Sequence, residues 1–206
     1  MPKPVRKTFL LNDDEDMIVS AGGVILYRVK KGNVELLIVE SRGLYEDLGG
    51  CVDKEDVDIF ETVSREAFEE SNELISKSKI KKRLKKDARF CYSKRSKYVT
   101  YIIKANTDEA KLKSDDFGDK EIHDDIFRKI KWLPLDVFLS KDIIDHKLNF
   151  RLKNKKLFEI LTDIKNQNKL GISIFTDSSD ELREIIRSEI AKKKKNELKN
   201  KELSKK

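Results

Sequence analysis

Residues 49–74 read GGCVDKEDVDIFETVSREAFEESNEL and hold the pattern on which the fold prediction depends. The second part of this stretch, residues 58–74, repeats apolar residues at the spacing of one helical face. These residues are Phe60, Val63, Ala67 and Leu74. The part before it, residues 41–58, is rich in Gly and Asp and has no period, which is typical of a loop. The stretch therefore predicts a long loop followed by an amphipathic helix.

The opposite face of the predicted helix is acidic. Four glutamates follow one another at spacings of three and four residues: Glu66, Glu69, Glu70 and Glu73. Like charges so placed destabilise an isolated helix by roughly 0.2–0.5 kcal/mol per pair. A hard divalent cation would offset that repulsion, because Mg²⁺ prefers oxygen ligands. The alternative is a solvated acidic face in a highly charged protein.

The segment 50–74 resembles the signature of the Nudix hydrolases. That signature is Gly, five residues, Glu, seven residues, then Arg-Glu-apolar-x-Glu-Glu-x-Gly-apolar. Gly50 fits the leading glycine, and residues 65–70 (REAFEE) match the core without a gap. The chain departs from the pattern at Asp56, which replaces Glu and is separated from Arg65 by eight residues instead of seven, and at Asn72 and Glu73, which replace Gly and the apolar residue. Asparagine tolerates the left-handed conformation nearly as glycine does.

The resemblance extends to about residues 17–140. SAGGVILY at residues 20–27 is similar to the first core strand of the family, and KWLPL at residues 131–135 is similar to its closing strand. The resemblance implies an α/β fold, a Nudix-like α/β/α sandwich with a mixed sheet. A C-terminal helical extension should follow it.

Other patterns place the remaining elements. Runs of β-branched and aliphatic residues predict strands, and amphipathic periods predict helices. They predict a hairpin over 17–41 that turns at 30–33, a second hairpin over 89–105, a strand over 126–134, a short helix near 136–139, and a helix over 146–166.

Three parts of the chain are expected. They are a flexible lead-in at 1–16, a Nudix-like hydrolase domain with helical extension at 17–176, and a C-terminal helix with a lysine-rich tail at 177–206. The capping-box pattern that begins at Ser178 predicts the start of the last helix.

The family resemblance implies an activity and roles for named residues. The activity is metal-assisted attack of water on a diphosphate linkage in a nucleoside diphosphate derivative. Mg²⁺ or Mn²⁺ is the implied cofactor. The implied metal ligands are Glu66, Glu69 and Glu70, and the residues that shape the loop are Gly49, Gly50, Asp56 and Arg65. The proton from water could be taken by Glu66 or Glu69, or by an acid of another loop. Glu121, in the acidic loop before the closing strand, is our candidate for that outside acid, and a surface acid is the alternative interpretation. Arg65 should anchor the loop through Asp56, and the two glycines should let the backbone turn sharply.

Charge suggests the kind of substrate. The net charge is +7, and residues 191–206 supply +6 of it through eight lysines and two glutamates. A second basic cluster, KSKIKKRLKK, occupies residues 77–86. Basic segments beside an acidic metal site suit a phosphate-rich substrate, and capped RNA is one candidate. The tail could instead serve solubility.

Three alternatives to cleavage of capped RNA stay open. The substrate could be a diphosphoinositol polyphosphate or a dinucleoside polyphosphate. The chain could also be a catalytically inactive Nudix-fold module that binds RNA or nucleotides. Oligomeric state is not predicted.

The composition favours an intracellular, cytoplasmic protein with no membrane partner. No apolar run approaches the roughly 20 residues that span a bilayer, and the N-terminus lacks a sustained apolar segment. Cys51 and Cys91 are expected as buried thiols without a disulfide. Tyrosines 92, 98 and 101, interleaved with basic residues, could hold a base or form ordinary cross-strand pairs.

Overall fold

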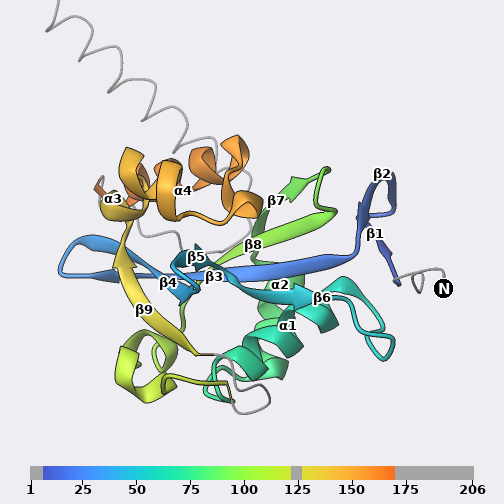
Figure 1. The fold of residues 1–206 in the computed structure, drawn as a ribbon, viewed down its shortest axis with the longest axis horizontal. Coiled ribbons are helices and arrows are strands. Elements are labelled where there is room, and N and C mark those ends of the chain that lie inside the picture. Colours follow the sequence, from blue (N-terminus) through green and yellow to red (C-terminus); the bar gives the residue numbers. More distant parts are fainter. Residues whose placement is uncertain (1–6, 122–126, 170–206) are drawn as a thin grey trace, which may run out of the picture. The chain divides into compact units, whose positions relative to one another are not determined.

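The computed structural model describes residues 7–121 and 127–169 of the 206-residue chain (Figure 1). The strands are β1 Phe9–Leu11, β2 Asp14–Val19, β3 Ala21–Lys30, β4 Asn33–Ser41, β5 Leu44–Glu46, β6 Leu48–Cys51, β7 Arg89–Ser93, β8 Tyr98–Lys104 and β9 Arg128–Pro134. The helices are α1 Ile59–Glu70, α2 Lys77–Lys86, α3 Leu135–Phe138 and α4 Lys155–Lys169. Short helical turns are η1 Glu109–Lys111, η2 Ser114–Phe117, η3 Ile143–Lys147 and η4 Phe150–Leu152.

The long strand β3 organises the main sheet. Its second half pairs antiparallel with β4, its first half pairs antiparallel with β6, and residues 21–27 pair parallel with β8. The order β5-β4-β3-β8-β7 is completed by β6 beside β3 and by β9 beside β4. The sheet is therefore mixed, and both predicted hairpins, β3–β4 and β7–β8, are confirmed.

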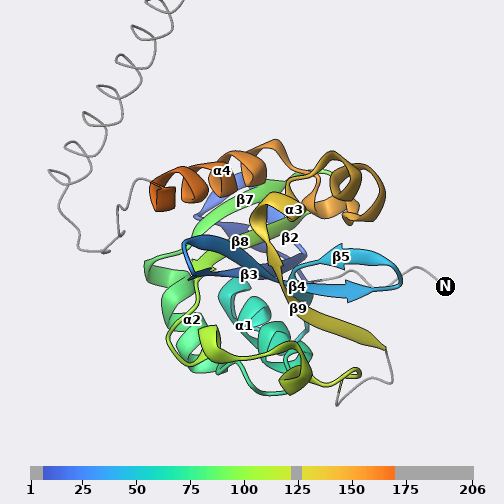
Figure 2. The ribbon, with the colours of Figure 1, turned by 90° about the vertical axis from the view of Figure 1, so that its left-hand side faces the viewer.

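Helices cover both faces of this sheet (Figures 1 and 2). Side chains of β4 alternate between two buried clusters: Leu37 and Val39 pack on the α1 side, and Leu36 and Ile38 pack on the α4 side. Burial on both faces explains why β3 and β4 are nearly continuous apolar runs instead of alternating ones. The predicted α/β/α sandwich with a mixed sheet is confirmed.

Helix α1 begins where the pattern predicted. The Asp58 carboxylate caps it by accepting a hydrogen bond from the Glu61 backbone N–H (2.6 Å). Val63 and Ala67 are fully buried on its inner face. The predicted end at Leu74 is wrong, since the helix ends at Glu70 and Leu74 is 41% exposed.

Two consecutive left-handed residues explain the early end of α1. Asn72 has φ 53° and Glu73 has φ 68°. A helix commonly stops at such a residue, and asparagine accepts this conformation more readily than most side chains do. Glu73 consequently leaves the stripe of Glu66, Glu69 and Glu70 and is exposed.

Three segments correct the sequence interpretation. Residues 9–16, expected in the flexible lead-in, form β1 and the start of β2, joined at two positive-φ residues, Asn12 and Asp13. The expected loop at 41–58 contains β5 and β6. The short strand β5 pairs with β4, and the Gly-rich strand β6 pairs with β3. The helix expected over 146–166 begins only at Lys155, after the turns η3 and η4.

The basic cluster at 77–86 also has a structure that its composition concealed. It is helix α2, which buries Ile80 and Leu84 four residues apart. The strand ending at Pro134 and the short helix α3 agree with prediction. The last helix and the lysine-rich tail lie outside the described residues. Among the described residues, no helix combines the length and apolar character required to cross a bilayer.

Candidate active site

One guanidinium holds the acidic helix and its preceding loop together. Arg65 donates to both carboxylate oxygens of Asp56, from Nε at 3.1 Å and from Nη2 at 3.0 Å, and Nη2 also donates to the Cys51 carbonyl (3.0 Å). Its Nη1 donates to Glu66 and to Glu69, each at 2.9 Å. The predicted bridge between Arg65 and Asp56 is therefore present, and the same residue binds two of the candidate metal ligands.

The Arg65–Asp56 pair is held in its ionised form. Burial acts to raise the pKa of Asp56, but the hydrogen bonds from Arg65, from the Asp53 N–H and from the Thr62 hydroxyl outweigh it and lower the pKa. Burial acts to lower the pKa of Arg65, but the bond to Asp56 and the charges of Glu66 and Asp56 raise it. Two fixed charges thus anchor the loop at the start of α1.

The carboxylates of Glu70 and Glu66 lie on the side of α1 that faces β6. Glu70 Oε2 accepts a hydrogen bond from the Gly49 N–H (2.8 Å). Burial raises the pKa of Glu70 well above its usual range, and the nearby Glu66 and Glu121 carboxylates raise it further. Burial also raises the pKa of Glu66 despite its ion pair with Arg65. Negative charge is therefore in excess at this point of the sandwich.

Gly49 and Gly50 act through close approach, which corrects the expectation of a sharp turn. Both lie in β6, paired with Gly23 and Gly22 of β3. A Cβ added at Gly49 would lie 2.5 Å from the Gly22 carbonyl oxygen. A Cβ added at Gly50 would lie 2.5 Å from each oxygen of Glu66. Glycine at position 49 thus lets β6 approach β3, and glycine at position 50 lets the Glu66 carboxylate lie against β6.

If Glu66 holds a metal ion, as the family resemblance implies, Gly50→Ala should displace its carboxylate and lower metal-dependent hydrolysis at least tenfold, with a smaller loss of stability. A flexible side chain can yield more easily than backbone, so the fold should survive. Turnover and thermal melting of the same preparation would check this. Gly32→Ala is a useful comparison, since nothing lies within 4 Å of its added Cβ, although its φ of +78° brings local strain. Full activity of Gly50→Ala would contradict the role given to Glu66.

The loop that carries Glu121 is tied to the end of α1. The Asn72 side chain donates to the carbonyl oxygens of Phe117 (2.7 Å) and Lys120 (2.8 Å). Asn72 stands where the Nudix signature has glycine. Its side chain makes two hydrogen bonds that glycine could not make. Glu121, the candidate acid that lies outside the segment 50–74, is thereby brought near Glu70.

A cleft of about 190 Å³ opens beside these acids. It is lined by Val39, Ser41, Arg42, Glu46, Glu70, Glu121 and Arg128. The Arg128 side chain is only 1% exposed, and its Nε lies 3.8 Å from Glu121 Oε1. Within the described residues its Nε and Nη2 make no hydrogen bond. The cleft thus combines two carboxylates of the site with donors suited to an anion.

Arg42 and Arg128 were missed by the sequence interpretation. Arg42 occupies the β4–β5 turn with φ 51°. The sequence predicted an irregular loop here, so this turn and the position of Arg42 were not predicted. Arg128 shares the inward phase of β9 with Ile130, since both are buried. A charged residue at an apolar phase of a strand is the signal that could have identified it.

Several candidates lie elsewhere. Tyr98 is buried, with its hydroxyl donating to Asp47 (3.0 Å), and Tyr101 is buried as well, so neither offers a face to a base. Cys51, expected as a buried thiol, is exposed, whereas Cys91 is buried and its pKa is raised to about 12 by desolvation. Over residues 7–121 and 127–169, no three His, Cys, Asp or Glu side chains already converge as a metal-binding group.

Comparisons with known proteins add only structural likenesses. No protein-family model and no curated protein sequence matches the chain. A C. elegans Ap4A hydrolase in a binary complex aligns with a TM-score of 0.44 and 17% identity, covering 71% of this chain and 96% of the other. The Nudix domain of Shewanella oneidensis NrtR, complexed with ADP ribose, aligns with a TM-score of 0.43 and 15% identity, covering 81% and 92%. At these TM-scores the likenesses add no weight to the site, which depends on the side chains described above.

Proposed function

We propose that the protein is a metal-dependent hydrolase of the Nudix type that cleaves a diphosphate linkage in a nucleoside diphosphate derivative. The observation that carries the proposal is the placement of three glutamates of α1 beside the cleft and the Arg65 guanidinium. Arg65 holds Glu66 and Glu69, while Glu70 lies against Gly49 beside a cleft that also contains Glu121. This arrangement agrees with the roles that the sequence resemblance implies.

The donor chemistry of the site fits Mg²⁺ or Mn²⁺. Carboxylate oxygens are the ligands these ions favour, and Glu66, Glu69 and Glu70 would hold them. Burial raises the pKa of Glu70, and the nearby Glu66 and Glu121 carboxylates raise it further. A divalent cation would offset the excess of negative charge among these three side chains. When bound, such an ion supplies positive charge for the diphosphate and makes water a better nucleophile at neutral pH.

The residues of the cleft have separate tasks in this proposal. Arg42 and Arg128 bind and orient phosphate oxygens of the substrate, because guanidinium donors match them in geometry and charge. Glu121, or one of the glutamates of α1, accepts the proton from the attacking water. Arg65 positions Glu66 and Glu69 and does not need to touch substrate.

Capped RNA remains the substrate that we propose to test first. Helix α2 supports it in part: Lys77 and Lys81 pair with Glu61, and Lys85 pairs with Asp58, so that face of the helix is neutralised. The exposed residues Lys79, Lys82 and Lys86 have no ion pair within the described part of the chain. Their spacing of three and four residues presents one basic stripe to an RNA backbone.

A substrate panel tests the proposal. The protein is incubated with Mg²⁺ or Mn²⁺ and capped RNA, a dinucleoside polyphosphate, ADP-ribose or a diphosphoinositol polyphosphate. We expect cleavage of at least one substrate, and none in EDTA. Arg42→Gln should lower kcat/KM about tenfold, since a hydrogen bond to a charged group contributes roughly 1.5–3 kcal/mol.

Arg95→Gln is the matched control, because Arg95 is exposed in the β7–β8 turn and does not line the cleft. It should leave kcat/KM unchanged. If the protein binds nucleotides or RNA but hydrolyses none of them with either ion, the proposed enzymatic activity is rejected. The catalytically inactive binding module is then favoured. Equal effects of the two substitutions would reject the assignment of the cleft.

A further inference from the structure

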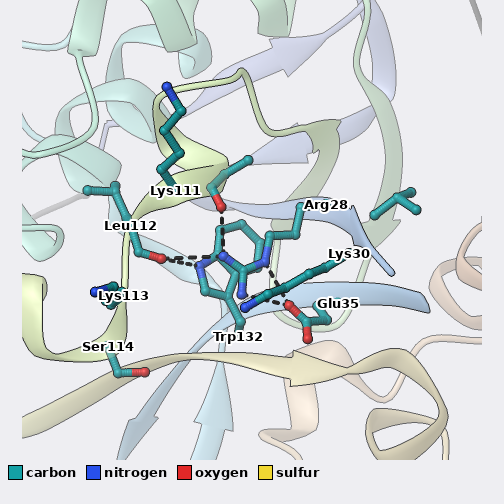
Figure 3. Close-up of a pocket in the computed structure, with 10 residues that line it drawn as sticks. Arg28, Lys30, Glu35, Lys111, Leu112, Lys113, Ser114 and Trp132 are labelled. Carbon is teal, nitrogen blue, oxygen red and sulfur yellow. Dashed lines mark hydrogen bonds and ion pairs between the residues drawn. The ribbon is translucent and has the colours of Figure 1, made fainter. Parts of the chain in front are cut away.

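A second, larger pocket lies at the opposite end of the β4–β9 pair. The cleft adjoins Ser41, which pairs with Arg128, whereas this pocket adjoins Glu35, which pairs with Pro134. Its volume is about 610 Å³. We call it the Trp132 pocket, and its principal lining residues are Arg28, Lys30, Glu35, Lys111, Lys113 and Trp132 (Figure 3).

The floor and wall of the Trp132 pocket are fixed by contacts within the protein. The Arg28 guanidinium lies 4.1 Å from the centre of the Trp132 ring, and its Nε donates to Glu35 (2.7 Å). Arg28 Nη1 donates to the Ala110 carbonyl (2.7 Å), and Trp132 Nε1 donates to the Leu112 carbonyl (2.9 Å). The dashed lines of Figure 3 show these bonds joining the strands to the segment that forms the wall. The pocket is therefore preformed.

The charge of the pocket is strongly positive. Four cationic side chains and one carboxylate line it, which gives a net charge of +3. Glu35 is already paired with Arg28. Lys30, Lys111 and Lys113 are exposed, and within the described residues they make no ion pair. These three ammonium groups therefore leave positive charge around the pocket that no ion pair of the described residues neutralises.

We propose that the Trp132 pocket binds a small polyanion that carries two or more phosphate groups, at a site separate from the hydrolytic cleft. Its volume lies within the range of roughly 300–1,000 Å³ typical of small-molecule sites. Lysine ammonium groups bind phosphates as point charges, and the Ser114 hydroxyl adds a donor at the wall. The proposal does not depend on hydrolysis in the cleft.

Trp132 is the only tryptophan of the chain, so its fluorescence reports directly on this pocket. The full-length protein is titrated with inorganic tripolyphosphate and, separately, with ATP at low ionic strength in EDTA. We expect a saturable change in emission with either probe. A response to ATP alone would show that the nucleoside, and not the phosphates, is recognised, and would overturn the proposal.

Two double variants with equal loss of charge locate the binding. Lys111→Gln with Lys113→Gln should weaken binding about fivefold, since two partly screened ion pairs are removed. Lys79→Gln with Lys82→Gln, on exposed positions of α2, should change it less than twofold. Equal weakening by both would mean diffuse attraction and would overturn the proposal.

Two further titrations distinguish the Trp132 pocket from the hydrolytic cleft. One replaces EDTA by Mg²⁺, and the other uses Arg42→Gln in EDTA, because Arg42 lines only the cleft. A signal that appears only with Mg²⁺, or that Arg42→Gln weakens as much as the Lys111 and Lys113 double variant does, would place the binding at the cleft and contradict a separate site. A protein that hydrolyses no substrate but retains the titration would refute the proposed activity and leave this inference standing. An unchanged emission spectrum with both probes would refute the inference alone.

Discussion

Glu70→Gln should lower the rate of diphosphate hydrolysis at least tenfold and at the same time raise the melting temperature of the metal-free protein. The rate should fall because the proposed metal ligand is removed, and even residues that only support metal ligands contribute factors of about 10–100. Stability rises because burial and two nearby carboxylates disfavour the Glu70 charge. Glutamine keeps an oxygen that can accept from the Gly49 N–H.

Turnover and thermal melting in EDTA check both halves of this expectation. In a chain of this size, relief of about 1 kcal/mol raises the melting temperature by roughly 2–4 °C. Glu73→Gln is the control, because Glu73 is exposed beyond the end of α1 and should affect neither quantity. Full activity of Glu70→Gln would remove Glu70 from the site. A fall in both activity and stability would show that Glu70 is structural.

Arg65→Ala should destabilise the protein by about 3 kcal/mol or more and abolish turnover. The Asp56 side chain is only 2% exposed, and loss of its partner leaves an uncompensated buried charge. The Cys51 carbonyl, Glu66 and Glu69 lose the same guanidinium. Lysine at this position should rescue little, since it lacks the fork that binds both oxygens of Asp56.

Urea unfolding of the wild type and the variant measures this loss. Arg89→Ala serves as a matched control, because the ion pair of Arg89 with Asp163 has side chains that are 40% and 44% exposed. Such a pair contributes about 1 kcal/mol or less. If Arg65→Ala cost no more than Arg89→Ala, the anchoring role of Arg65 would be contradicted.

Local patterns in the sequence predicted many of the strands and helices, and the family resemblance predicted their arrangement as a sandwich. Composition predicted β3 and β4 from their apolar runs, and periodicity predicted α1 from its apolar stripe. Helical spacing grouped the acids of α1 on one face. What escaped prediction depends on partners distant in the chain. Segment 48–51 becomes a strand only because β3 offers a ladder, and its glycines fit only because β3 and α1 approach so closely.

The candidate site shows the same division. Glu66, Glu69 and Glu70 could be grouped from spacing alone, whereas the placement of Arg42 and Arg128 required the folded sheet. The positive charge of α2 suggested a free basic surface. Pairing of its lysines with Asp58 and Glu61 neutralises one face, which only tertiary packing reveals.

A Mn²⁺ titration tests most directly whether the acids of α1 hold a divalent ion. Electron paramagnetic resonance measures Mn²⁺ binding, without substrate, to the wild type, to Glu70→Gln and to Glu73→Gln. We predict saturable binding by the wild type and by Glu73→Gln, and binding at least tenfold weaker by Glu70→Gln. Equal Mn²⁺ affinity of all three proteins, or no binding by the wild type, would contradict the metal site.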